Sequence, residues 1–219
     1  MDRRLAARAW ADFRSQWRTS LAFHLLMQLL GVAIFTPIVS WIGRRIVLAS
    51  GEPVISNFDI AAFALSTTGI AFVLVIAALS VSLLLAEFAG QSWLAGHAIA
   101  RHRVTVWSAV ALVLGLLPRL IRLSARVFLR LLMLAMPFLA AAAIVWFTML
   151  GGHDINYYLA EYPPEWQRAR ALAVVLVAGY SLLAAWQLAR WLYAVPILVF
   201  AGASPARALD DSTDATHGR

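Results

Sequence analysis

Long apolar stretches recur four times along the sequence, separated by segments that contain arginine, glycine and proline. An α-helix needs about 20 mostly apolar residues to cross the hydrocarbon layer of a bilayer, and each stretch has roughly that length. We therefore predict an all-α integral membrane protein, a helical bundle of about four transmembrane helices with additional amphipathic helices at the interface. The predicted transmembrane helices cover residues 21–42, 68–88, 131–150 and 171–189.

The first 20 residues form an amphipathic N-terminal segment. Trp10, Phe13 and Trp17 recur every three or four residues, with arginines around them. Such a helix either lies in the headgroup plane or simply extends the first transmembrane helix, and the sequence leaves both interpretations open. We expect residues 21–203 to form the transmembrane domain and residues 204–219 a cytoplasmic tail.

Residues 91–130 and 191–203 are predicted to be interfacial helices. The apolar part of the first segment, residues 104–117, is short for a crossing, and Pro196 interrupts the second. A basic stripe follows residue 117 at three- and four-residue spacing, so a helix places it on one side. This basic stripe either contacts anionic lipid headgroups or acts only as a topology signal. Its members are Arg119, Arg122, Arg126 and Arg130.

Composition and charge agree with a membrane location. Hydrophobic residues make up 62% of the chain, whereas soluble domains contain about 45–50%. The formal net charge is +7, and all 18 basic residues are arginine. Because these arginines flank the apolar stretches, we expect the lipid bilayer, including anionic phospholipid, as the partner, and no nucleic acid.

The arginines also predict the topology. They are in excess before residue 20, within residues 101–130 and within residues 190–207, whereas residues 43–67 and 151–168 are balanced or acidic. Arginine-rich segments stay on the cytoplasmic side of a membrane. We therefore predict a multi-pass protein of the plasma (inner) membrane with both termini in the cytoplasm.

No catalytic motif is visible. The absence of cysteine excludes disulfides, thiol catalysis and zinc–thiolate sites, and we find no HExxH, GxSxG or phosphate-binding glycine motif. We predict no catalytic residue, no metal site and no cofactor. His153 and Asp154 are adjacent, but a metal site needs three or four converging ligands, which favours a structural loop. Glu87, near the end of the second transmembrane helix, is either functional or simply solvated or paired with a nearby arginine.

The loop after the third transmembrane helix resembles a known family. Residues 153–159 read HDINYYL and residues 161–166 read EYPPEW. They closely resemble the HDINYYL…PPEF segment of the membrane domain that precedes bacterial glycerophosphoryl diester phosphodiesterase catalytic domains. ISNFDI at residues 55–60 and AEFAG at residues 86–90 agree in order. An RW…P…AL..S pattern is formed by Arg190, Trp191, Pro196, Ala208, Leu209 and Ser212. The signature residues of the loop are His153, Asp154, Ile155, Asn156, Tyr157, Tyr158, Pro163 and Pro164.

The resemblance implies a membrane-anchoring and substrate-presenting domain of a glycerophosphodiester phosphodiesterase involved in phospholipid metabolism. In the family, further transmembrane helices and a TIM-barrel phosphodiesterase usually follow the AL..S helix, whereas here Gly218 and Arg219 end the chain. The catalytic domain's His-Arg-Gly and Glu-Asn-Thr motifs are absent. We therefore expect a truncated module whose partner is a downstream phosphodiesterase domain. Arg190 joins the basic stripe among the residues expected to contact lipid headgroups.

Other function classes make different demands on the sequence. A stand-alone transporter should show inverted repeats or matching broken helices, and no convincing repeat is visible. An intramembrane enzyme needs ionisable groups that converge inside the membrane, yet the predicted transmembrane helices are nearly free of charge. A scaffold for another protein stays open as an alternative.

Overall fold

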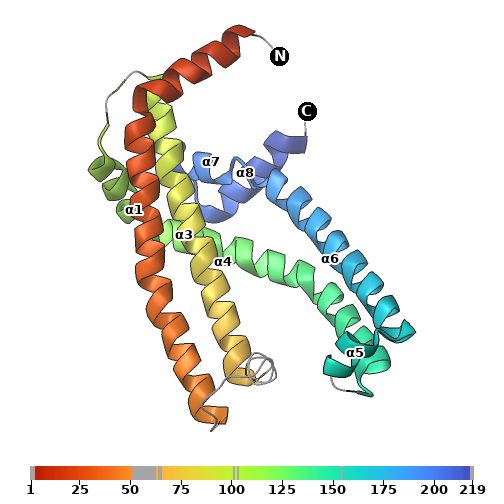
Figure 1. Cartoon of the computed structure of the whole chain (residues 1–219). Coiled ribbons are helices and arrows are strands. Elements are labelled where there is room, and N and C mark those ends of the chain that lie inside the picture. The colour runs from red at the N-terminus through yellow and green to blue at the C-terminus, as the bar shows by residue number, and fades with distance from the viewer. Residues whose placement is uncertain are drawn as a thin grey trace. The chain divides into compact units, whose positions relative to one another are not determined.

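The computed structural model describes residues 3–50, 63, 66–100, 102, 104–153 and 155–217, and within these ranges the regular structure is entirely helical. The elements are α1 (Arg3–Ser50), α3 (Thr67–Ile99), α4 (Val106–Val145), the π-helical segment η1 (Trp146–Leu150), α5 (Ile155–Glu161), α6 (Pro164–Arg190), α7 (Ala194–Phe200) and α8 (Pro205–His217). Figure 1 shows these elements in chain order from red to blue. The predicted all-α fold is confirmed.

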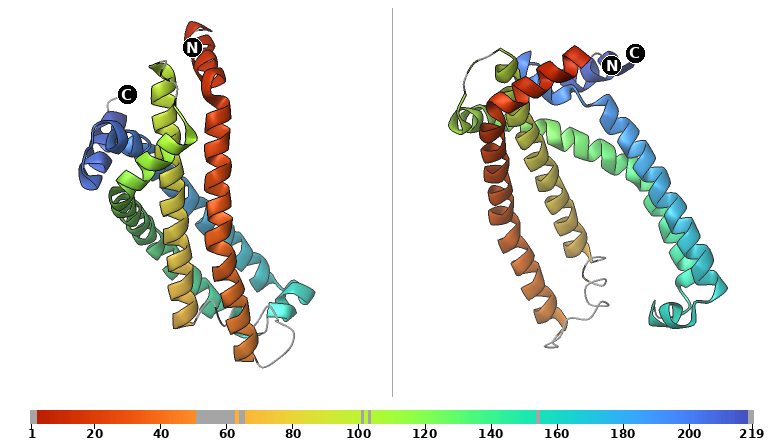
Figure 2. Two further views of the ribbon diagram at one scale, coloured as in Figure 1. Left: turned by 90° about the vertical axis from the view of Figure 1, so that its left-hand side faces the viewer. Right: turned by 45° about the horizontal axis from the view of Figure 1, so that its top comes forward.

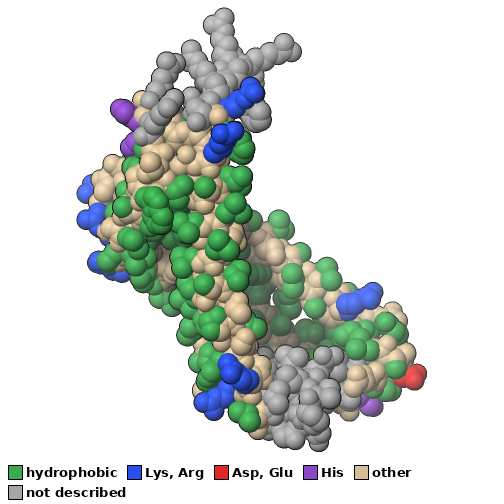
Figure 3. Space-filling model, turned by 60° about the vertical axis from the view of Figure 1, so that its left-hand side comes forward, with side chains coloured by type: hydrophobic (Ala, Val, Ile, Leu, Met, Phe, Trp, Pro, Cys, Tyr) green, Lys and Arg blue, Asp and Glu red, His purple; other side chains and the backbone are tan. Residues whose placement is uncertain are grey.

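Four helical segments are long and apolar enough to cross a membrane within the described part of the chain. They are Gln16–Arg45, Thr67–Ile99, Val106–Leu150 and Pro164–Phe200. Each predicted transmembrane helix falls inside one of them. At most 11% of the most apolar part of each segment is buried by the protein itself. Figure 3 shows one face on which hydrophobic side chains cover the helices while cationic side chains form separate groups. Such a surface needs lipid around it, and the protein is a multi-pass membrane protein.

The helices extend beyond the predicted transmembrane boundaries. Helix α1 continues from Arg3 to Ser50 through Pro37, so the N-terminal segment and the first transmembrane helix are one helix. Residues 91–99 continue α3, and residues 106–130 continue directly into the third transmembrane helix within α4. A change from polar to apolar side chains leaves the backbone hydrogen-bond ladder intact, so it does not end a helix. Whether residues 106–130 follow the membrane surface stays a prediction.

Capping side chains lie at the observed starts of α3 and α4. Ser66 accepts a hydrogen bond from the backbone N–H of Gly69 at 3.1 Å and so caps α3. Before α4, the Thr105 hydroxyl accepts from the Ser108 N–H at 3.3 Å, and the Ser108 hydroxyl accepts from the Thr105 N–H at 3.1 Å. This reciprocal pair is a capping box, which satisfies backbone donors that a helix start leaves unpaired.

The described chain divides into two compact units. Unit 1 comprises Met1–Ala125 and Ala194–Ala208. In it α1 packs against α3, and α3 against α7; Figure 2 shows α1 and α3 side by side in both views. Phe23 is fully buried, and a Cβ added to Gly90 would overlap its ring. The glycine of the AEFAG segment therefore lets α1 and α3 approach closely.

Unit 2 comprises Arg126–Tyr193 and Leu209–Arg219. Its small core contains Leu150, Tyr158 and Ala169, against which Val145, Met149 and Trp166 pack. The end of α4 and the start of α6 are thus joined through η1 and α5.

Candidate functional site

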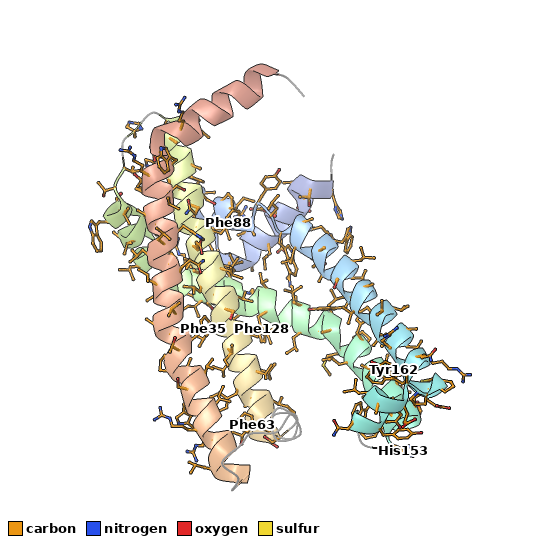
Figure 4. The ribbon with its side chains drawn as sticks, in the orientation of Figure 1. Phe35, Phe63, Phe88, Phe128, His153 and Tyr162 are labelled. Atoms are coloured by element: carbon orange, nitrogen blue, oxygen red, sulfur yellow. The ribbon has the colours of Figure 1, made fainter. Side chains whose placement is uncertain are left out.

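The loop that carries the family resemblance folds into an aromatic cluster in unit 2. The ring of His153 stacks on Tyr157 with centroids 4.3 Å apart, and Tyr157 meets Tyr158 edge-on at 5.5 Å. Tyr158 in turn lies 6.1 Å from Trp166 at the start of α6. Figure 4 labels His153 and Tyr162 at the two ends of the loop around α5. Three of the signature residues, His153, Tyr157 and Tyr158, therefore form one aromatic cluster that extends to Trp166.

Tyr158 anchors this cluster. Only 4% of its surface is exposed, and its hydroxyl donates to the backbone oxygen of Met149 at 3.4 Å. Met149 belongs to η1, where the last carbonyls of the helix have no partner within the helix itself. The tyrosine thus supplies both the apolar ring for the core and a donor for one of these carbonyls.

The two signature prolines begin α6. Pro163 precedes the helix in an extended conformation and Pro164 is its first residue, a position where the missing N–H costs nothing. Tyr162, just before them, has a left-handed backbone with φ of 46°. The Gln167 side chain donates to the Tyr162 oxygen at 3.2 Å and holds this turn. The PP pair therefore fixes where the loop ends and the helix starts.

The chemistry available in the loop is limited. His153 is committed to aromatic stacking, and the side chains of Asp154 and Ile155 lie outside the described part of the structure. Across the described residues, no group of three or more His, Asp or Glu side chains gathers where a metal could bind. Beside the cluster lies a pocket of about 220 Å³ whose lining includes Trp146, Trp166 and Arg170. The described contacts of the loop pack and stack side chains between the end of α4 and the start of α6.

The arginines of the basic stripe all lie exposed on α4. Arg122 donates to the Pro118 oxygen at 3.1 Å, and Arg119 to the Gly202 oxygen at 3.4 Å. Arg130 lies over the Trp191 ring, 5.4 Å from its centroid. The leucines and valine on the neighbouring side of the helix are buried inside the protein and not open to lipid: Leu120, Leu123 and Val127.

Arg190 and Ser212 of the RW…P…AL..S pattern meet at the end of α6. The Ser212 hydroxyl donates to the Arg190 oxygen at 2.8 Å and accepts from the Tyr193 N–H at 3.1 Å. Ser212 is fully buried. It satisfies backbone groups that the break between α6 and α7 would otherwise leave without partners.

The Arg190 side chain already has contacts within unit 2. Its guanidinium lies 4.7 Å from the centroid of the Trp186 ring and 3.0 Å from Nε2 of His217. These contacts hold the end of α8 beside the end of α6. The expected contact between Arg190 and a lipid headgroup stays a prediction.

Sequence analysis missed a polar ladder between α1 and α3. Glu87 pairs with His24 and not with an arginine, which was one of the alternatives that the sequence left open. Gln91 donates to the Ser20 backbone oxygen at 3.0 Å, and Gln28 to the second Glu87 oxygen at 3.5 Å. A signal was present, because Ser20, His24 and Gln28 recur every four residues in α1 while Glu87 and Gln91 do the same in α3.

Comparison with known proteins gives a family match. Residues 7–219 match the family described as the membrane domain of glycerophosphoryl diester phosphodiesterase. No curated protein and no solved structure matches the chain. The match includes the aromatic loop, the Glu87–Gly90 segment and the Ser212 contact described above. The chain therefore belongs to the family of glycerophosphoryl diester phosphodiesterase membrane domains.

Proposed function

We propose that this chain anchors a glycerophosphodiester phosphodiesterase catalytic domain at the membrane and presents membrane-derived phosphodiesters to it. One observation carries the proposal: the family match over residues 7–219 coincides with four helices able to span a membrane. An enzyme held at a surface meets substrates of that surface at a high effective concentration, without any new contact to them. The phosphodiesterase domain and an anionic phospholipid are the proposed partners.

The proposed orientation follows the arginines. Both termini lie in the cytoplasm and residues 151–168 lie outside, in the plasma (inner) membrane of a bacterium. The aromatic loop, from His153 to Trp166, then clamps the outer ends of α4 and α6. On the inner side, the exposed basic stripe and Arg190 contact the phosphates of anionic phospholipid.

A fusion experiment tests presentation separately from anchoring. A soluble glycerophosphodiester phosphodiesterase barrel is attached after residue 219 and compared with the barrel alone and with the barrel on one unrelated transmembrane helix. The substrates are soluble glycerophosphocholine and a singly acylated phosphodiester held in vesicles. We expect equal rates on the soluble substrate. On the vesicle substrate, this chain should raise the rate over the unrelated anchor by roughly tenfold or more. Equal rates with the two anchors would remove the presenting role and leave anchoring alone.

A further inference from the structure

Unit 1 contains a groove lined almost entirely by hydrocarbon. Its volume is about 570 Å³, and α1, α3 and the first half of α4 form its walls. The lining side chains include Leu30 and Phe35 of α1, Leu83 of α3, and Leu114 and Leu117 of α4. Figure 4 labels Phe35 on α1. The walls from α1 and α3 lie within the predicted transmembrane helices, and the wall from α4 belongs to the segment that is predicted to be interfacial.

The groove offers few hydrogen bonds to a ligand. The residues with polar side-chain groups in its lining are Trp107, which is 74% exposed, and Ser82. Its hydroxyl donates to the Ala78 oxygen at 2.8 Å and lies 2.7 Å from the Ser124 hydroxyl, which itself donates to the Ile121 oxygen at 2.9 Å. Both hydroxyls are thus engaged within the protein. A polar ligand would lose its own hydrogen bonds on entering, so the groove selects hydrocarbon.

The length of the groove suits an acyl chain. Along α1 the lining runs from Phe23 to Phe35, a rise of about 18 Å. The hydrocarbon layer is about 30 Å thick, so one leaflet takes about half of it. The groove therefore has about the length of an acyl chain in one leaflet.

We propose that this groove binds one acyl chain of a membrane phospholipid. Leu30 and Leu114 are 46% and 62% exposed, so the groove is open on its side and a chain can enter from the bilayer. Apolar walls and an apolar chain gain dispersion contacts that a void would lack. The bound lipid is a built-in component of unit 1, and the proposal does not depend on the proposed function of the whole chain.

Photolabelling of the full chain tests this site. The chain is reconstituted in vesicles of phosphatidylcholine and phosphatidylglycerol, both carrying a diazirine in the middle of one acyl chain. Mass spectrometry then maps the crosslinks. We expect crosslinks at Leu30, Leu114 and Leu117 to be at least fivefold more frequent than at lipid-facing residues of α6 such as Val174 and Val177. Equal labelling of the groove and of α6 would overturn the proposal.

Adjacent residues provide matched variants. Leu30→Trp and Leu83→Trp place a bulky ring in the groove, whereas Leu29→Trp and Leu84→Trp place it on the exposed outer face of the same helices. The two groove variants should lose most of the enrichment and the two outer variants should keep it. Enrichment that survives in Leu30→Trp and Leu83→Trp would also overturn the site. The cysteine-free chain also allows a test for a second copy of the protein as the occupant. If Leu114→Cys forms disulfide-linked dimers efficiently, a second copy and not an acyl chain occupies the groove.

Discussion

Single buried polar groups hold the helix breaks of this protein in place. Ser212 is 0% exposed and serves two backbone groups at once, the Arg190 oxygen and the Tyr193 N–H. The Tyr158 hydroxyl likewise donates a hydrogen bond to one backbone carbonyl of η1, that of Met149. In both cases a residue of the family pattern satisfies the backbone where a helix ends. Backbone hydrogen bonding therefore accounts for part of the family pattern.

Removal of the Ser212 hydroxyl should destabilise the folded chain. Ser212→Ala leaves the Tyr193 N–H and the Arg190 oxygen buried without partners, at a cost of about 1–3 kcal/mol. We expect a clearly lower melting temperature in detergent for this variant. Thr213→Ala is the matched control, because the Thr213 hydroxyl donates to the Leu209 oxygen of its own helix. Equal melting temperatures for the two variants would show that the Ser212 contacts carry no stability.

The His24–Glu87 pair should contribute to the packing of α1 on α3. Coupling energies across transmembrane helices average about 0.6 kcal/mol and reach about 1.7 kcal/mol. A double-mutant cycle with His24→Ala and Glu87→Ala should give a stabilising coupling in this range. Unfolding in a denaturing detergent measures it. Strictly additive effects would mean that the two side chains do not interact in the membrane.

At the level of elements, hydropathy predicts well which parts of the chain form long apolar helices, and it predicts the helix ends poorly. The length of an apolar run indicates how much of a helix can be surrounded by lipid. All four predicted transmembrane helices lie inside the long apolar segments of the structure. Helix ends depend on capping instead, as the Thr105–Ser108 pair before α4 shows. This T-x-x-S pattern was visible in the sequence. The partners of Ser212 were not visible, because they depend on how distant helices pack. The four-residue spacing around Glu87 indicated a polar face on each helix but did not identify His24 as the partner.

The basic stripe on α4 should give the protein a preference for anionic lipid. Each exposed arginine near an anionic surface contributes up to about 1 kcal/mol, less at high salt. With Arg119, Arg122, Arg126 and Arg130 all changed to Gln, lipid that co-purifies with the chain should lose its enrichment in phosphatidylglycerol. The measurement uses the intact chain and not a peptide, because Leu120 and Leu123 are buried in the folded protein and a peptide would expose them.

The controls for this prediction separate charge from structure. The same four positions changed to Lys keep the positive charge and should keep the enrichment. Gln at both Arg168 and Arg170, which are exposed on α6, should have no effect. Unchanged enrichment after the four Arg→Gln changes would leave the stripe as a topology signal only.

At the level of the whole molecule, the distribution of the arginines predicts the orientation. If all four candidate segments cross, both chain ends lie on one side and residues 151–168 on the other, and the arginine-rich segments share the side of the termini. The positive-inside rule assigns that side to the cytoplasm.

Single-cysteine labelling tests this orientation in the cysteine-free chain, with a membrane-impermeant maleimide applied to intact cells. Ser40→Cys and Asn156→Cys should be labelled from outside. Ala215→Cys, on the exposed side of α8, should react only after the cells are opened. If Ala215→Cys reacts in intact cells while Ser40→Cys and Asn156→Cys do not, the proposed orientation is inverted and the basic stripe faces the outer leaflet.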